Sequence, residues 1–219
     1  MNIETQIKAW GAEPPRDCPL CPRLVAYREE NRAQHPDWWN GPAPSFGDPN
    51  GRLLVAGLAP GRMGANRTAR PFTGDHAGWL LYDTLLKLGF AKGKYEARPD
   101  DSLELVDCMV SNAVRCAPPG NKPETSEENT CRQFLAKRLA DMPNLKVIVT
   151  LGDVSRRNVL KALGYKASAG APGHGSIFDA GPIRLINSYH CSRLNTNTGR
   201  LTRAMFEDIF RQAKAHIDS

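Results

Sequence analysis

The segments KVIVTL (residues 146–151) and RLLVAGL (residues 52–58) decide the fold of this 219-residue chain. Each is a short apolar run without polar alternation, which is typical of a strand buried on both faces. Similar runs predict further strands over residues 106–114 and 183–186. Apolar residues at helical spacing lie around these runs and predict helices over residues 18–32, 78–88, 125–141, 154–163 and 201–217.

Strands that alternate with helices predict a parallel sheet with helices on both faces. We therefore expect an α/β protein: a single three-layer α/β/α domain over residues 1–219, with a central, mainly parallel sheet of four strands. Residues 1–50 are expected to form an N-terminal lead-in. Ligands of such sheets bind beyond the carboxyl ends of the strands, so the loops of interest span residues 59–77, 115–123 and 188–199.

Composition narrows the class of protein. Hydrophobic residues make up 41% of the chain, but no apolar run approaches the roughly 20 residues that a membrane-spanning helix needs. The first seventeen residues mix polar and apolar side chains and lack the pattern of an export signal, so we expect a cytoplasmic protein that does not contact membranes. The net charge of +6 favours a polyanionic partner.

Arginines are concentrated in two of the three loop regions. Four lie between Asp48 and Asp75 without an intervening acid, and four more lie between Asp179 and Glu207. Solvated surface arginines are the simplest interpretation. Their coincidence with glycine-rich loops at strand ends instead favours contact with phosphates.

Cysteine spacing indicates a metal site. Cys18 and Cys21 form a C-x-x-C pair, and Cys116 and Cys131 lie far along the chain. Four thiolates from distant segments can bind zinc or an iron–sulfur cluster, and the spacing does not choose between them. A redox C-x-x-C is disfavoured because no strand precedes Cys18, as a thioredoxin-type motif would require.

The first loop begins with GLAPGRMG (residues 57–64), whose glycines let the backbone approach a ligand closely. Its spacing matches neither the dinucleotide nor the triphosphate motif, although a nonstandard nucleotide loop remains an alternative. Phe72 is either a core residue or a surface on which a base stacks. Asp75 precedes a predicted helix, where it is either an N-cap or a reactive carboxylate.

The other two loops carry polar side chains without apolar periodicity. Asn121 in RCAPPGNKP is either a turn residue or a carboxamide that reads the edge of a base. SYHCSRLNTNTGR (residues 188–200) concentrates His190, Arg193, Asn195 and Arg200, and this composition indicates contact with a polar ligand.

Taken together, GLAPG, RPFTGD, VRCAPPGNKP and SYHCSRLNTNTGRLT, with CPLC near the start, resemble the iron–sulfur uracil-DNA glycosylases, and in particular their family 5. The resemblance runs in order from Cys18 through the final helix. Where family 4 carries a glutamate in its first motif, this chain has Leu58. In family 5 the aspartate of the FTGD segment is the principal catalytic carboxylate, and it matches Asp75.

The resemblance implies an enzyme of DNA repair that removes uracil, and other deaminated bases such as hypoxanthine, by hydrolysing the N-glycosidic bond. It implies a structural [4Fe-4S] cluster on the four cysteines, a catalytic group and a DNA-binding group. The catalytic residues would be Asp75, His190 and Asn121. The substrate contacts would be Gly57, Leu58, Ala59, Gly61, Phe72, Asn121 and His190, and the DNA contacts would be Arg62, Arg67, Arg193, Asn195 and Arg200.

The chemistry of base excision suits these assignments. Cleavage of the C1′–N1 bond leaves positive charge on the sugar and negative charge on the base, so Asp75 and His190 would act on opposite charges. The resemblance also implies that residues 193–199 enter the duplex from which the base has been flipped. A noncatalytic, metal-stabilised nucleic-acid-binding module is the alternative, with Asp75 as a helix cap. We expect a monomer in either case.

Overall fold

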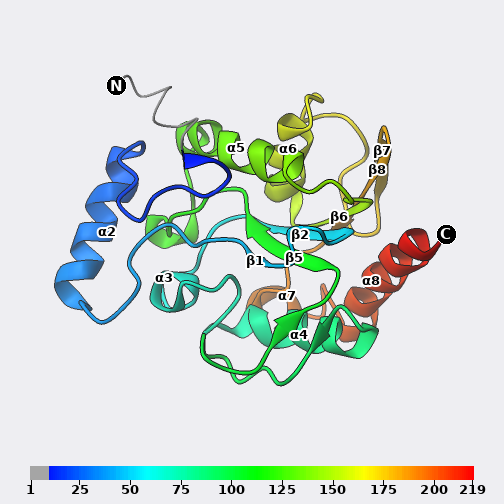
Figure 1. The fold of residues 1–219 in the computed structure, drawn as a ribbon, viewed down its shortest axis with the longest axis horizontal. Coiled ribbons are helices and arrows are strands. Elements are labelled where there is room, and N and C mark those ends of the chain that lie inside the picture. The colour runs from blue at the N-terminus through cyan, green and yellow to red at the C-terminus, as the bar shows by residue number, and fades with distance from the viewer. Residues whose placement is uncertain (1–9) are drawn as a thin grey trace.

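The computed structural model describes residues 10–219, so the first nine residues of the expected lead-in lie outside the described residues. Its centre is a six-stranded sheet in the order β1-β5-β2-β6-β8-β7, with helices on both faces (Figure 1). The strands of this sheet are β1 (Phe46–Gly47), β2 (Leu53–Gly57), β5 (Cys108–Asn112), β6 (Val147–Leu151), β7 (Ile177–Ala180) and β8 (Ile183–Ser188).

The predicted α/β class and the mainly parallel sheet are confirmed, but the expectation of four strands is wrong. The four predicted strands, β5, β2, β6 and β8, pair in parallel at the centre. The two edge strands, β1 and β7, are antiparallel to their neighbours. Strand β1 has only two residues, and β7 is exposed at two of its four residues, so neither gives the apolar run that marks a buried strand.

Residues 10–219 contain five longer helices. They are α2 (Pro22–Gln34), α4 (His76–Leu88), α5 (Thr125–Ala140), α6 (Asp153–Ala162) and α8 (Arg203–Asp218). Four of them, α4, α5, α6 and α8, cover the faces of the sheet. Short helices α3 (Ala65–Thr68) and α7 (Arg193–Asn197), a 3-10 turn η1 (Pro119–Asn121) and a hairpin of β3 (Ala91–Lys92) with β4 (Glu104–Leu105) complete the described elements. Of the described residues, none form a helix long and apolar enough to span a membrane.

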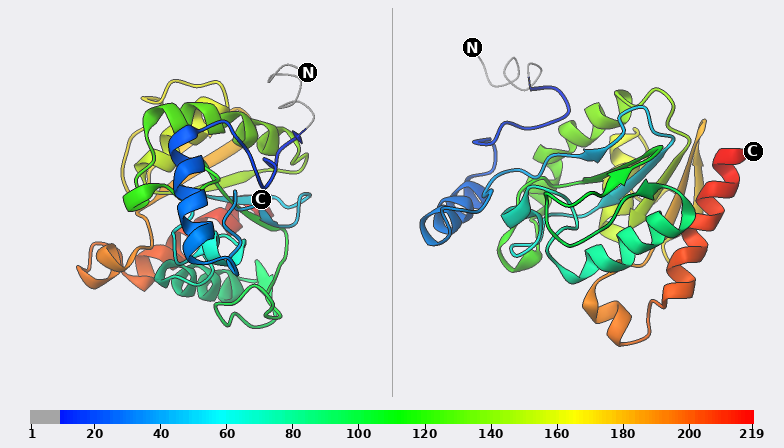
Figure 2. Two further views of the ribbon diagram at one scale, coloured as in Figure 1. Left: turned by 90° about the vertical axis from the view of Figure 1, so that its left-hand side faces the viewer. Right: turned by 60° about the horizontal axis from the view of Figure 1, so that its bottom comes forward.

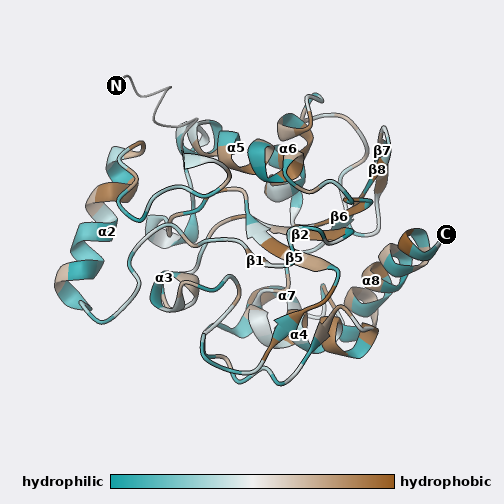
Figure 3. Ribbon diagram, viewed as in Figure 1, coloured by the Kyte–Doolittle hydropathy of each residue, from teal (hydrophilic) through white to brown (hydrophobic). Residues whose placement is uncertain are grey.

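Two hydrophobic clusters cover the two faces of the sheet. Alternate residues of β2 supply both of them: Leu53 and Val55 pack with α4 and α8, whereas Leu54 and Ala56 pack with α5 and α6. This alternation follows from the two-residue period of a strand. Figure 3 shows the hydrophobic colouring concentrated on the central strands. The three-layer arrangement therefore results from strands that are apolar on both sides.

Several element boundaries differ from the sequence prediction for local reasons. Helix α2 begins at Pro22, not at residue 18, because proline suits the first helical position and Cys21 is extended. Helix α5 begins at the predicted residue, Thr125, and a capping box joins Glu124 and Glu127 at its start. Helix α2 lies outside the three layers, next to the loop that follows β5, and α7 projects below the sheet near α4 (Figures 1 and 2).

Candidate active site

A cleft of about 480 Å³ opens where β2, β5 and β8 end. Its position at the carboxyl ends of parallel strands is the predicted one. All three predicted catalytic residues, Asp75, His190 and Asn121, line it. So do six other predicted residues, which are Leu58, Ala59, Gly61, Arg62, Phe72 and Arg193.

Asp75 lies at the N-cap position of α4, but its side chain forms no capping hydrogen bond. Its Oδ1 atom is buried and has no hydrogen-bond partner among the described residues. Burial raises the pKa of this carboxyl, while the backbone N–H groups of Gly78 and Ala77 partly oppose the rise. Asp75 therefore occupies the N-cap position, and its Oδ1 atom is left without a hydrogen-bond partner in the described part of the chain.

The glycines of the first loop make room for this carboxylate. A methyl group at Gly61 would come within 3.2 Å of Asp75 Oδ2, and one at Gly64 would overlap it. Because both glycines line the cleft, the backbone of the loop passes directly beside the acid. The loop backbone therefore lies close to Asp75, whereas the predicted approach of this backbone to a ligand stays a prediction.

Phe72 forms the inner wall of the cleft. Its backbone is left-handed (φ 53°), and its ring is 8% exposed and belongs to the core cluster shared with α4 and α8. Gly57 lies behind the ring, where a Cβ atom would approach it within 2.7 Å. Gly57 therefore does not line the cleft but allows Phe72 to do so. Phe72 is therefore a core residue whose ring also lines the cleft.

His190 faces Phe72 across the cleft, with ring centroids 6.1 Å apart and ring planes inclined by 31°. Burial lowers the pKa of the imidazole, so it is neutral at neutral pH. The backbone carbonyl of His190 accepts a 2.8 Å hydrogen bond from the Asn195 carboxamide. Asn195, predicted as a DNA contact, does not line the cleft and uses its side chain to hold this loop.

Sequence reasoning missed Asn112, the last residue of β5. Its side chain lines the cleft, it is 2% exposed, and its Oδ1 atom has no hydrogen-bond partner among residues 10–219. The available signal was a polar residue at the end of an apolar strand. Asn121, which was predicted, is exposed and left-handed (φ 57°) in η1. The cleft thus presents two carboxamides, one at its base and one on a turn.

The eight loop arginines divide into two groups. Four are ion-paired, and of these pairs only the one with Arg70 is buried: Arg52 with Asp107, Arg70 with Asp101, Arg184 with Asp179, and Arg203 with Asp83. The other four form no ion pair with any acid that the structure describes, and they are the predicted DNA contacts Arg62, Arg67, Arg193 and Arg200. Arg62 is held by Asn31 and Gln34 of α2, and Arg200 lies 4.5 Å from the centre of the Tyr189 ring.

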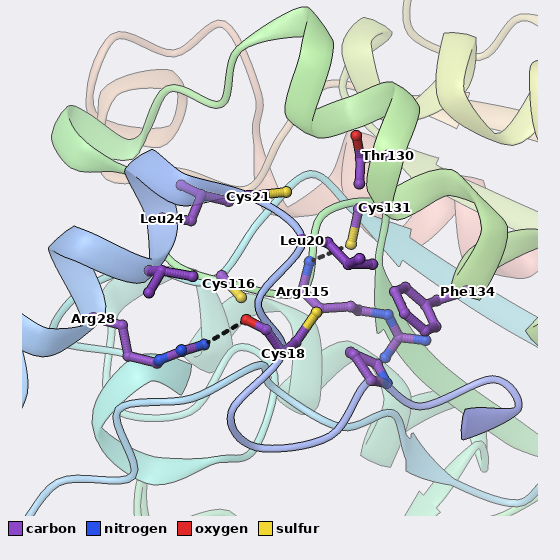
Figure 4. A pocket seen from close by; sticks show the side chains of 12 residues that line it. Cys18, Leu20, Cys21, Leu24, Arg28, Arg115, Cys116, Thr130, Cys131 and Phe134 are labelled. Carbon is purple, nitrogen blue, oxygen red and sulfur yellow. Dashed lines mark hydrogen bonds between the residues drawn. The ribbon is translucent and has the colours of Figure 1, made fainter. Parts of the chain in front are cut away.

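The four predicted cysteines line a second pocket, between α2, α5 and the loop after β5 (Figure 4). Its other lining residues are mostly apolar, with Arg28 and Arg115 also present. Burial raises the pKa of all four thiols, to about 11 for Cys21 and about 12 for Cys131. Among residues 10–219, no three Cys, His, Asp or Glu side chains are grouped closely enough to hold a single metal ion.

Comparison with known proteins agrees with this geometry. A family model described as the uracil DNA glycosylase superfamily matches residues 44–214, which is most of the chain. The chain belongs to the uracil-DNA glycosylase superfamily. Among curated members, the type-5 uracil-DNA glycosylase of Thermus thermophilus is 45% identical, over 90% of this chain and 92% of that protein.

This chain is also more similar to a type-5 relative than to a type-4 relative from one and the same organism. A type-5 uracil-DNA glycosylase of Pyrobaculum aerophilum is 39% identical over 91% of this chain and 88% of its own length. A type-4 uracil-DNA glycosylase of the same organism is 27% identical over 69% of this chain and 64% of its own length. The resemblance to family 5 seen in the motifs is therefore confirmed over nearly the whole chain.

Proposed function

We propose that this protein hydrolyses the N-glycosidic bond of uracil in DNA and leaves an abasic site. One observation carries the proposal: the unpartnered carboxylate of Asp75 and the imidazole of His190 line the same cleft at the carboxyl ends of the sheet. Inside a duplex the glycosidic bond is shielded, so the nucleotide must first be flipped into this cleft.

Asp75 acts on the sugar. As the C1′–N1 bond breaks, its electron pair leaves with the base and positive charge develops on the sugar. A carboxylate whose Oδ1 atom has no hydrogen-bond partner is free to stabilise that charge and to orient a water molecule. The water oxygen then bonds to C1′, and its proton balances the anionic base that departs. Gly61 and Gly64 let the loop backbone pass beside the Asp75 carboxylate without a side chain in the way.

His190 acts on the base. A neutral imidazole donates one N–H, which suits a uracil carbonyl oxygen that gains charge in the transition state. A preorganised donor of this kind contributes roughly 3 kcal/mol to lowering the barrier. Because Asp75 and His190 stabilise charges of opposite sign, neither residue accounts for the whole rate enhancement.

Base recognition is assigned to the inner wall. The ring of Phe72 offers a face on which uracil stacks, and such stacking is worth about 1–3 kcal/mol per base. The Asn112 carboxamide, with a buried free oxygen, pairs with the donor edge of the base, and Asn121 completes that contact from the turn. Leu58, Ala59 and Gly61 supply backbone groups at the same wall.

DNA binding is assigned to the four unpaired arginines and to α7. Arg62 and Arg193 line the cleft, and Arg67 and Arg200 flank it in the same loops. Leu194 of α7 is 72% exposed, which is unusual for a large apolar side chain. Apolar side chains that project in this way act as wedges between base pairs. Leu194 therefore fills the space that the flipped nucleotide leaves.

A four-cysteine [4Fe-4S] cluster is assigned to the second pocket, with Cys18, Cys21, Cys116 and Cys131 as its ligands. Both a zinc ion and an iron–sulfur cluster accept four cysteine thiolates, and the four cysteines line one mostly apolar pocket. The resemblance of the motifs to family 5 uracil-DNA glycosylases favours the cluster over zinc. When bound, the cluster supplies a covalent link between α2 and the segment that carries Cys116 and Cys131.

Base release from defined duplexes tests the proposal. We expect wild-type protein to generate alkali-labile sites in a duplex with one uracil and none in the matched thymine duplex. We also expect release of hypoxanthine, since a cleft of about 480 Å³ accommodates a purine. Binding of every duplex without release of any base would instead establish the noncatalytic module.

A further inference from the structure

The loop between α6 and β7 returns to the carboxyl end of the sheet and packs against the segment that carries His190. Gly175 N–H donates to the Asn187 carbonyl (2.7 Å), and Asn187 N–H donates to the Ser176 carbonyl (2.9 Å). The Asn187 carboxamide also donates to the Gly173 carbonyl (2.7 Å). These bonds place residue 174 directly beside Tyr189, the neighbour of His190.

His174 holds the backbone of Tyr189 through one ring nitrogen. The Tyr189 N–H donates to His174 Nδ1 at 3.1 Å, and the two rings lie 5.2 Å apart at 33°. A backbone N–H can only donate, so Nδ1 carries no proton in this arrangement and the ring proton is on Nε2. The contact therefore exists only for one tautomer of the neutral imidazole.

Neighbouring bonds fix the rest of this segment. The Ser188 carbonyl accepts from Gly152 N–H (2.8 Å), and the His190 carbonyl accepts from Asn195 (2.8 Å). The Tyr189 N–H lies between these two anchors, and His174 is its partner. A change at His174 thus frees the peptide that immediately precedes His190.

We propose that His174 is a positioning residue for His190: its Nδ1 atom anchors the Tyr189 backbone and thereby aims the catalytic imidazole into the cleft. The inference rests on the proposed function, because it concerns the same site. It assigns a role to the loop after α6, which contributes no residue to the cleft lining.

The same contact makes the site sensitive to acid. Protonation turns Nδ1 into a donor that faces another donor, and the bond to Tyr189 is lost. Burial lowers the pKa of His174, while the backbone of Met205 and the carboxylate of Asp208, both on α8, raise it. Tyr189 lies on the other side, with Arg200 over its ring. Because the net shift is downward, the anchor persists at neutral pH and is lost as the pH falls through this lowered pKa.

Two variants of His174 separate anchoring from simple packing. An asparagine oxygen can take the place of Nδ1 but does not titrate, whereas leucine fills the space without an acceptor. We expect His174→Leu to lower the single-turnover rate of uracil release about tenfold, with less than a twofold change in duplex affinity. His174→Asn is expected to retain most of the rate, and His216→Leu, on the last turn of α8, serves as the matched control.

Two readouts test the contact and its consequence separately. Hydrogen exchange at the Tyr189 amide should be slow in wild type and His174→Asn and fast in His174→Leu, whether or not the protein releases any base. Slow exchange in the leucine variant would overturn the anchor, and fast exchange with an unchanged rate would overturn the positioning role. The ratio of wild-type to His174→Asn rates should be constant near neutral pH and fall under acidic conditions; a flat ratio would refute the acid sensitivity.

Discussion

The cleft and the four-cysteine pocket both lie near the carboxyl ends of the strands, yet they place reactive groups in opposite environments. In the cleft, Asp75 and Asn112 each carry a buried oxygen without a hydrogen-bond partner. In the pocket, the reactive atoms are thiols, enclosed mainly by apolar side chains. Unpaired polar atoms lower the stability of a fold, whereas cross-linking groups raise it.

We infer from this difference that the unpaired polar residues of the cleft serve the reaction, whereas the cysteines of the pocket serve the stability of the fold. Substitutions in the cleft should therefore change the rate and spare or improve stability. Substitutions in the pocket should change stability first. The following experiments separate the two regions by measuring both quantities for each variant.

Asp75→Asn is expected to show the largest effect. Loss of the carboxylate should lower the single-turnover rate of uracil release about 10³-fold, near the upper end for removal of one electrostatic contact. The free energy of unfolding at neutral pH should rise, because a buried charge without a partner is removed. Base release and thermal unfolding, measured on the same sample, check the expected loss of rate and the expected gain in stability.

Asp83→Asn is the matched control, since Asp83 lies on the same helix and forms only an exposed pair with Arg203. It should leave the rate unchanged and alter stability by less than about 1 kcal/mol. A rate within threefold of wild type for Asp75→Asn would remove Asp75 from the mechanism.

Cys131→Ala should show the opposite pattern. If the thiol is a cluster ligand, its removal costs the cross-link between two distant segments, comparable with loss of a disulfide, about 3 kcal/mol. Cys108→Ala removes another buried sulfur, from β5, and should cost only about 1 kcal/mol. Urea unfolding, with visible absorption to follow the cluster, measures the difference; equal losses would contradict the assignment of Cys131.

The sequence revealed the centre of the fold and most of the cleft for physical reasons. Apolar runs such as KVIVTL predict buried strands because both faces must be covered, and loops at the strand ends then meet at one edge. The family motifs identified Asp75 and His190, which indeed line one cleft.

Other features depend on contacts between distant segments and leave no local signal. The pairing of Arg70 with Asp101 removes an arginine from the basic loop, although the two residues are 31 positions apart. The free oxygen of Asn112 and the contact of His174 with Tyr189 arise only when loops pack together. The edge strands β1 and β7 are likewise defined by pairing rather than by composition.

Leu194→Ala should have an intermediate effect that depends on the substrate. If Leu194 replaces the flipped nucleotide in the stack, its loss slows uracil release from a duplex about tenfold, since unstacking costs a few kcal/mol. On single-stranded DNA, which has little stacking to disrupt, the change should be less than twofold. Ile177→Ala is the control, because Ile177 is also an exposed large apolar residue (45%) but lies on edge strand β7. An equal loss on both substrates would argue against a wedge.

The ionisation of Asp75 should have the smallest effect on the rate of uracil release near neutral pH. Measured over a range of pH, it separates the effect of this residue on the rate from its effect on stability. The carboxylate is the active form, so the rate falls as the pH drops through the pKa of Asp75, with a limiting slope of one log unit per pH unit. Because burial raises that pKa, the fall begins at a higher pH than for an exposed aspartate.

Stability responds to the same ionisation with the opposite sign. A carboxyl whose pKa is raised in the folded state contributes stability that is fully present below its unfolded pKa and is lost as the pH rises through its folded pKa. Acid therefore favours the protonated, inactive Asp75 and the folded state together. Asp75→Asn should remove this contribution, so the difference in unfolding free energy between variant and wild type should shrink as the pH falls. A difference that stays constant across this range would show that the Asp75 carboxylate is not strained by burial.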